Sequence, residues 1–168
     1  MQIQTWPGGP PNFRNLLEGD YEMRLRGEYQ HSVDSKSRVS LPAKFRKALP
    51  DEVTVVPVSD SDYGKALYVF SEEGYDAWVD SIFNTEEGGY NPRSRKHIAL
   101  QRYLNASAES VAIDAAGRIK LSSKQCEKVG IVKDVTIIGQ GDHIEIWDTV
   151  ALNDYMESVD PFGDFLEA

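Results

Sequence analysis

One phrase of this sequence occurs twice, about 80 residues apart. The first copy, "HSVDSKSRVSLPAKFR", spans residues 31–46, and the second, "VAIDAAGRIKLSSKQC", spans residues 111–126. In each copy an Asp precedes an Arg by four positions, inside a polar turn between two short alternating segments. A repeat of this length constrains the fold strongly, because each copy is one supersecondary unit and must bury its apolar face against the other.

The residues around the phrase extend the repeat. Alternating apolar residues predict strands, and capping residues mark the starts of helices. Each unit therefore reads as strand, turn, strand, short helix, strand, strand and helix. We expect strands at 26–33, 38–41, 52–58, 65–70, 109–113, 118–121, 134–139 and 143–147, and helices at 42–49, 72–83, 122–130 and 149–159. Ser71 and Asp148 are the expected N-caps of the two longer helices, and Gly130 closes the short helix of the second unit.

Five segments follow from this pattern. They are a flexible N-terminal extension rich in Pro and Gly (residues 1–22), a first repeat (23–83), a connector helix (84–108), a second repeat (109–157) and an acidic C-terminal tail (158–168). In the connector, Asn91 is the expected cap and Pro92 the first helical residue. The fold class is therefore mixed α/β and rich in β-structure.

The bulk composition favours a cytoplasmic protein. The chain has 168 residues and a single cysteine, so an internal disulfide is impossible. No apolar run approaches the roughly 20 residues that span a bilayer, and the first residues lack the basic start and apolar core of a signal peptide. We expect no membrane association.

Charge is distributed unevenly along the chain. The formal net charge is −9, yet residues 24–47 carry seven Lys or Arg against two acids, and residues 93–102 carry four against none. Residues 50–90 hold ten acids against one Lys, and residues 142–168 hold eight acids and no Lys or Arg. Because screening limits each charge to about 8 Å at physiological salt, a basic face can bind a polyanion despite the acidic total.

Enzyme chemistry finds little support. The three histidines, His31, His97 and His143, fall on different expected elements, and a lone Cys126 leaves no metal-ligand spacing. No Gly-containing loop follows a strand in the manner of a phosphate cradle, and no nucleophile motif is present. We expect no enzyme, no catalytic residue, no metal, no cofactor and no small-molecule substrate.

The repeated Asp and Arg predict a turn with its own internal clamp. Asp34 and Asp114 can accept backbone N–H bonds, and Arg38 and Arg118 can bond the carboxylates four residues before them. Gly117 can supply any positive φ that the second turn demands. In the first turn the equivalent residue is Ser37, which implies either strain or a negative φ.

The first copy is the more basic one. Lys36 occupies the tip of its turn, where the second copy has Ala116. A short turn that carries Lys and Arg can enter the major groove of DNA, where Arg bonds guanine and Lys holds phosphates. One such turn makes few contacts and binds weakly, so DNA binding predicts an oligomer that engages several sites together.

At this point the sequence resembles a known family. "RGEYQHSVDSKSRVSLPAKFR" and "IDAAGRIKLSSKQCEKVGIVKDVTIIGQGDHIEIWD" are similar to the first and second signatures of the MraZ family, over about residues 23–157. The resemblance implies a bacterial transcription factor with two tandem AbrB-like swapped-hairpin units, which form one pseudo-two-fold small β-barrel with flanking helices. Ser37 and Ser122 depart from the family, which usually has Gly and Pro there.

The resemblance also implies a mode of action. Family members are expected to be nucleoid-associated repressors that form ring-shaped homo-oligomers. They bind short direct repeats in double-stranded DNA upstream of the division and cell-wall gene cluster, including their own promoter. Carried over residue by residue, DNA contact falls on Lys36 and Arg38, with Arg26, Lys44 and Arg46 in support.

An alternative function remains open at this point. Many AbrB-type units join a DNA-binding domain to a segment that binds a toxin. In this chain the end "DPFGDFLEA", residues 160–168, could make the protein an antitoxin-like or adaptor module.

Overall fold

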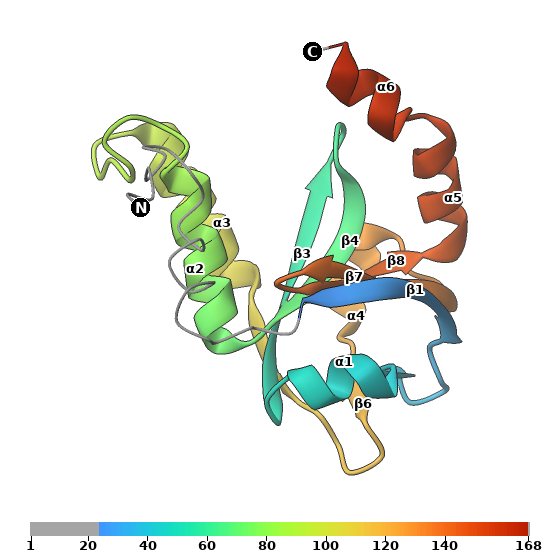
Figure 1. Ribbon diagram of the computed structural model, residues 1–168. Helices are drawn as coiled ribbons and strands as arrows, with labels where there is room; N and C mark the ends of the chain where they lie inside the picture. Colours follow the sequence, from blue (N-terminus) through green and yellow to red (C-terminus); the bar gives the residue numbers. More distant parts are fainter. Residues whose placement is uncertain (1–23, 168) are drawn as a thin grey trace, which may run out of the picture.

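The structure is a computed structural model that describes residues 24–167, so the expected N-terminal extension (1–22) lies outside the described residues. Eight strands and six helices follow one another along this part of the chain (Figure 1). They are β1 (Leu25–Ser32), β2 (Arg38–Ser40), α1 (Ala43–Ala48), β3 (Glu52–Asp60), β4 (Gly64–Phe70), α2 (Glu72–Phe83), α3 (Arg95–Ser107), β5 (Glu109–Ala112), β6 (Arg118–Lys120), α4 (Ser123–Val129), β7 (Asp134–Gly141), β8 (Ile144–Asp148), α5 (Thr149–Glu157) and α6 (Pro161–Leu166). The fold is mixed α/β.

The two halves of the chain exchange strands. A six-stranded antiparallel sheet has the order β1-β7-β8-β4-β3-β5, and β2 and β6 form a separate antiparallel ribbon. Replacing each strand of one half by its counterpart in the other (β1 by β5, β2 by β6, β3 by β7, β4 by β8) reproduces the same order read backwards. The first strand of each half thus pairs with the third strand of the other half.

The large sheet is open. β1 and β5 are its end strands, and no pairing within residues 24–167 joins them. Each end strand leads through an Asp–Arg turn into the β2–β6 ribbon instead, so the strand pairing does not show the expected closure into a small barrel.

One core lies between the sheet and the ribbon. Its fully buried side chains come from both halves and from both layers: Val39, Phe45, Val55, Ile119, Ile137 and Ile146. Val39 and Ile119 pair directly across the ribbon and point inward, while their neighbours in sequence point outward. Because neither half could enclose this cluster alone, burial of the core requires the exchange of strands.

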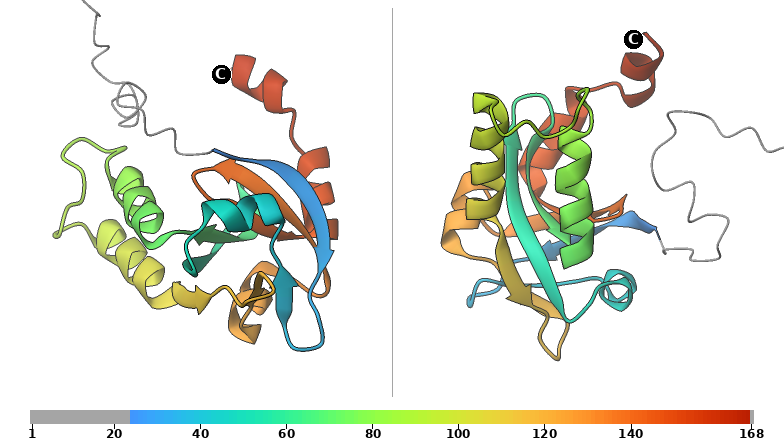
Figure 2. Two further views of the ribbon diagram at one scale, coloured as in Figure 1. Left: turned by 60° about the horizontal axis from the view of Figure 1, so that its bottom comes forward. Right: turned by 90° about the vertical axis from the view of Figure 1, so that its left-hand side faces the viewer.

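Two helical extensions project from the sheet. α2 and α3 lie next to each other on one side, and α5 and α6 lie on the other, while α1 and the two Asp–Arg turns occupy the opposite end of the molecule from α6 (Figures 1 and 2). α6 lies within the acidic C-terminal tail.

Local sequence fixes most helix starts as expected. The side chain of Ser71 accepts a hydrogen bond from Gly74 N, and that of Asp148 accepts one from Ala151 N. Gly130 ends α4 with φ 72°. These three predictions are confirmed.

The start of the connector helix was wrongly predicted. Asn91 does cap a turn, because its Oδ1 accepts from Arg93 N, but the helix begins at Arg95 and its N-cap is Ser94. Ser94 Oγ accepts from His97 N and displaces the start by one turn, and Pro92 remains outside the helix.

Candidate nucleic-acid interface

The first Asp–Arg turn is closed by hydrogen bonds to one carboxylate. Asp34 Oδ1 accepts from Lys36 N and Arg38 N, both at 2.9 Å, and Arg38 Nε donates to Asp34 Oδ2 at 3.0 Å. The backbone adds bonds from Ser37 N to Asp34 O and from Asp34 N to Arg38 O. The carboxylate therefore organises the turn, and the guanidinium of Arg38 bonds it through Nε.

The second turn repeats this geometry bond for bond. Asp114 Oδ1 accepts from Ala116 N and Arg118 N at 2.9 Å, and Arg118 Nε donates to Asp114 Oδ2 at 2.9 Å. Since the second turn has Ala at its tip, this network needs no basic tip residue. In both turns the Asp carboxylate and the Arg four residues later are thus bonded within one copy.

The two turns are also bonded to each other's units. Leu41 N donates to Gly117 O at 2.9 Å, and Leu121 N donates to Ser37 O at 2.8 Å. These reciprocal bonds continue the β2–β6 ribbon at both ends. The carbonyl of the residue just before the Arg in each turn, Ser37 or Gly117, thus accepts a hydrogen bond from the other half of the chain.

Ser37 takes the same left-handed backbone as its counterpart. Its φ is 60°, and that of Gly117 is 77°; within residues 24–167, Ser37 is the only residue other than Gly with a positive φ. Of the two alternatives expected for Ser37, the negative φ is wrong, and its backbone is strained. The bond from Leu121 to the Ser37 carbonyl accounts for the conformation being kept.

Arg46 lies against the second turn at Gly117. A Cβ placed on Gly117 would come within 2.6 Å of Arg46 Cδ and closer still to Arg46 Nη1, so the Arg46 side chain of α1 lies directly on the second turn. The 80-residue offset puts Cys126, a small residue, at the position equivalent to Arg46. A side chain at position 117 would therefore have to displace the Arg46 side chain.

The outer face of the ribbon is basic. Arg38 pairs with Lys120, and Ser40 pairs with Arg118, as directly opposed residues of β2 and β6. Opposed residues of a ribbon present side chains about 5 Å apart on the same face. Sequence analysis missed Lys120, which only the pairing of the two copies brings beside Arg38.

Four of the five predicted DNA-contacting residues belong to the first turn, β2 and α1, and the fifth, Arg26, lies near the start of β1, away from the first turn. Lys36 is exposed at the tip of the first turn, and Arg38 begins β2. Lys44 and Arg46 are exposed on α1, and Lys44 Nζ lies 3.4 Å from the carbonyl of Arg26 on β1. The structure thus links Lys44 to Arg26 and places Arg46 across the second turn. The turns and α1 occupy one end of the molecule (Figure 2, left).

The clamp shifts the titration of both aspartates. The hydrogen bond from Arg38 N is the main reason that the pKa of the Asp34 carboxyl lies below its ordinary value of 3.8. The bond from Arg118 N has the same effect on the pKa of Asp114. Both groups are carboxylates at neutral pH and keep the two turns closed.

Two of the three histidines, His97 and His143, have hydrogen-bonding partners. Buried His97 bonds Glu86 through Nε2, and buried His143 bonds Asp142 and Glu145. Within residues 24–167 no group of three or more His, Cys, Asp or Glu side chains is arranged to hold a metal ion. No helix in this part of the chain is long and apolar enough to cross a membrane.

Comparison with known proteins identifies the family. The family model "MraZ protein, putative antitoxin-like" matches residues 24–87 and 104–163. The chain belongs to the MraZ family. It is 32% identical over 135 residues to the transcriptional regulator MraZ of Spiroplasma kunkelii, an alignment that covers 80% of this chain and 89% of the relative.

Two further relatives carry the same name. The transcriptional regulator MraZ of Treponema denticola is 31% identical over 144 residues, covering 86% of this chain and 94% of the relative. That of Caldanaerobacter subterraneus is 35% identical over 138 residues, covering 81% and 89%. The alignments span both turns, which accords with the resemblance seen in the sequence.

Substitutions at Ser37 and at Gly117, the equivalent positions of the two turns, should change the free energy of unfolding in opposite directions. Ser37→Gly should raise the free energy of unfolding by about 1 kcal/mol, because Gly adopts a positive φ without the steric cost of a Cβ. Gly117→Ser should lower it by about 1–2 kcal/mol, because it adds that cost and displaces Arg46. Urea unfolding of each variant measures both values. Ser35→Gly, in the same turn, is the control and should give no gain; an equal gain there would refute the strain at Ser37.

The lowered pKa values predict acid sensitivity of a definite sign. A carboxyl whose pKa is lower in the folded state stabilises the fold above its unfolded pKa, and this contribution is lost as the pH falls through the folded pKa. As the pH falls from about 5 through the ordinary carboxyl pKa and below it, Asp34→Asn/Asp114→Asn should therefore lose less stability than the parent chain. Urea unfolding at a series of pH values tests this, with Asp154→Asn as the control; equal pH slopes for the double variant and the parent would contradict it.

Proposed function

We propose that this protein is a sequence-specific DNA-binding transcriptional regulator that contacts DNA through its first Asp–Arg turn. One observation carries the proposal: two turns with the same hydrogen bonds differ at the tip, and only the first presents an exposed lysine. Lys36 stands there beside the basic outer face formed by Arg38 and Lys120. The names of the relatives support the regulatory role, and no catalytic function is proposed.

The fold proposed for this function is the AbrB-like swapped hairpin. Two observations support this fold. The strand order of the large sheet is unchanged when the two halves of the chain are interchanged, and each turn accepts a hydrogen bond from the other half. In this proposal the β2–β6 ribbon closes the core as the missing wall of a small barrel. The first repeat (23–83) and the second (109–157) act as the two pseudo-symmetric partners, joined through residues 84–108.

Contacts are proposed to divide between bases and backbone. We propose that Arg38 reads guanine: its Nε bonds Asp34, which leaves the two terminal nitrogens of the guanidinium for a base. Lys36, Lys44 and Arg46 supply phosphate contacts, and Arg26 extends the basic surface along β1. The acids of residues 50–90 and 142–168 lie outside the two turns, and we propose that they face away from DNA or lie between subunits.

Assembly is proposed to multiply this small interface. A single turn neutralises few phosphates, so its binding is weak and sensitive to salt. A ring-shaped homo-oligomer that engages consecutive direct repeats gains affinity without any new contact within one subunit. We propose that such a ring acts as a nucleoid-associated repressor in the cytoplasm, at repeats in its own promoter upstream of the division and cell-wall genes.

A second candidate function is an antitoxin-like or adaptor role. The observation that favours it is the apolar side of α6, where Phe162, Phe165 and Leu166 are 82%, 79% and 77% exposed. Exposed aromatic residues on a short acidic helix are typical of a segment that binds another protein. Experiments on α6 variants distinguish a foreign protein from a second copy of this chain as the partner of this helix.

Substitution of Lys36 tests the proposed interface with little risk to the fold. Lys36→Ala keeps the backbone N–H that bonds Asp34, so the turn should remain closed. DNA affinity should fall, and the slope of log affinity against log salt should become shallower by about 0.9 for each phosphate that the variant no longer neutralises. Fluorescence anisotropy with promoter DNA at several salt concentrations measures both quantities.

A matched control removes the same charge elsewhere. Lys65→Ala changes an exposed lysine of β4, outside both turns, and should leave the affinity and the slope unchanged. If Lys36→Ala and Lys65→Ala behave alike, the first turn is not the DNA contact.

A further inference from the structure

The last helix presents an apolar side that no described residue covers. Phe162, Phe165 and Leu166 are spaced as i, i+3 and i+4, so their side chains share one face of α6. All three are more than three-quarters exposed. α6 is nonetheless a defined helix, because Asp160 Oδ1 accepts from Gly163 N and Asp164 Oδ2 accepts from Asp160 N.

Charge restricts what can cover this helix. Residues 142–168 carry eight acids and no Lys or Arg, and Asp164 and Glu167 lie on α6 itself or at its end. An acidic aromatic helix is repelled by DNA and by anionic surfaces, so its partner should be basic and able to receive aromatic rings.

The same chain carries such a surface on α3. Residues 93–102 hold Arg93, Arg95, Lys96 and Arg102 and no acid. Arg95 and Arg102 are exposed and seven residues apart, so they lie two turns from each other on one side of the helix. Half-buried Ile98 and exposed Ala99 lie between them on that side and form a short apolar strip with an Arg at each end.

This surface is held rigidly. Tyr75 Oη of α2 donates to Leu104 O of α3 at 2.9 Å, and His97 bonds Glu86 in the segment between the helices. We call α2, α3 and residues 84–94 between them the arm. Because the arm is already ordered, binding to it would cost little conformational entropy.

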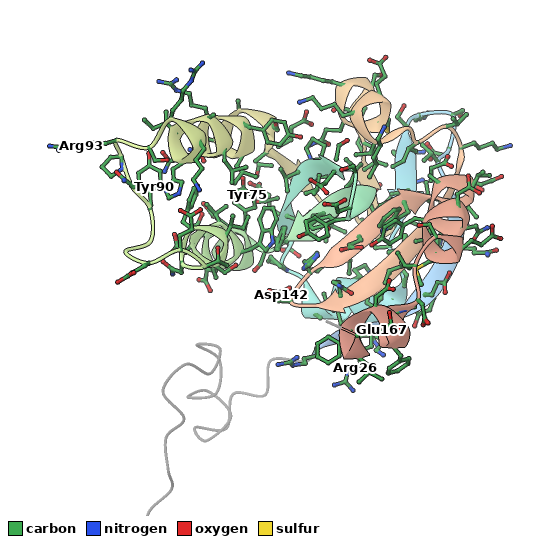
Figure 3. The ribbon with its side chains drawn as sticks, turned by 90° about the horizontal axis from the view of Figure 1, so that it is seen from above. Arg26, Tyr75, Tyr90, Arg93, Asp142 and Glu167 are labelled. Carbon is green, nitrogen blue, oxygen red and sulfur yellow. The ribbon has the colours of Figure 1, made fainter. Side chains whose placement is uncertain are left out.

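The arm and α6 of one molecule lie too far apart to meet. Figure 3 shows Arg93 at the far end of the arm and Glu167 on α6, on separate sides of the molecule. Figure 1 likewise places α3 and α6 on opposite flanks of the sheet. A contact between them therefore has to join two molecules.

We propose that α6 of one copy of this chain docks on the α3 face of the arm of a second copy, with Phe162 and Phe165 against the strip between Arg95 and Arg102. The two surfaces differ, so the contact is head-to-tail, and repeated copies close into a ring or extend into a filament. This inference rests on the oligomer of the proposed function and names the surfaces that build it.

The first experiment measures mass by size-exclusion chromatography with light scattering. The parent chain should elute as an oligomer, and Phe162→Asp/Phe165→Asp and Arg95→Glu/Arg102→Glu should each elute as monomers of 18.8 kDa. Val132→Asp, at an exposed apolar residue outside α6, and Lys133→Glu, at an exposed lysine outside the arm, are the matched controls and should keep the parent mass.

The second experiment mixes the two monomeric variants. The α6 variant keeps an intact arm, and the arm variant keeps an intact α6, so one sound interface can form between them. A heterodimer of twice the monomer mass should appear in the mixture and in neither variant alone. Because both variants must be folded to form it, the heterodimer also excludes misfolding as the cause of dissociation.

Specific outcomes would overturn the inference. If either variant keeps the parent mass, or if no heterodimer forms, α6 does not bind the arm, while the proposed ring could still stand on other surfaces. A monomeric parent chain would overturn both the inference and the ring. If α6 variants instead lose only a foreign protein in a pull-down, with their mass unchanged, the inference fails and the adaptor function is favoured.

DNA binding separates this inference from the proposed turn contact. The monomeric variants should bind a single short site as the parent subunit does, but should lose the 10²–10⁴-fold gain expected on consecutive sites. If Arg95→Glu/Arg102→Glu weakens binding to the single site while the mass is unchanged, the arm contacts DNA and the inference fails.

Discussion

The pair of hydrogen bonds between each Asp–Arg turn and the opposite unit is the constraint on which the rest of the structure depends. Leu41 donates to Gly117, and Leu121 donates to Ser37, so each unit completes the other's turn. The bonds fix the β2–β6 ribbon, which supplies the second wall of the core. Without them the apolar faces of the two units would have no common partner, and the large sheet would be covered on one side only.

The two Asp–Arg turns share the groups that hold their backbone and differ in the residues that carry positive charge. Both turns have the carboxylate clamp, and both have a positive φ at the residue just before the Arg, which is Ser37 in the first turn and Gly117 in the second. The residues that differ are therefore free to serve another purpose: Lys36 against Ala116 at the tip, and Arg46 against Cys126 on the following helix. A duplicated unit can hold its fold with the same geometry in both copies and concentrate positive charge in one.

Much of the fold could be predicted from the sequence. The caps at Ser71 and Asp148 and the glycine that ends α4 depend on residues a few positions apart, and each was predicted correctly. At the connector two caps compete within four residues, and pattern alone did not decide between Asn91 and Ser94. Local signals thus predict elements well and their exact starts less well.

The candidate site was predictable only in part. Lys36 and Arg38 follow from the repeat, but Lys120 joins them through a pairing of residues 82 positions apart, which no local pattern reports. The contact of Arg46 with Gly117 likewise depends on how α1 packs across the second unit. The repeat does indicate this difference between the turns. With the offset of 80 residues, Arg46 in the first copy corresponds to a smaller residue, Cys126, in the second.

Photo-crosslinking from the two turn tips tests the central claim most directly. A photoreactive residue is placed at position 36 in one variant and at position 116 in another, and each is irradiated with promoter DNA. The two positions have the same hydrogen-bonded backbone, so any difference reflects their place in the complex. The account predicts strong crosslinking from position 36 and little from position 116; equal crosslinking, or crosslinking from 116 alone, would contradict it.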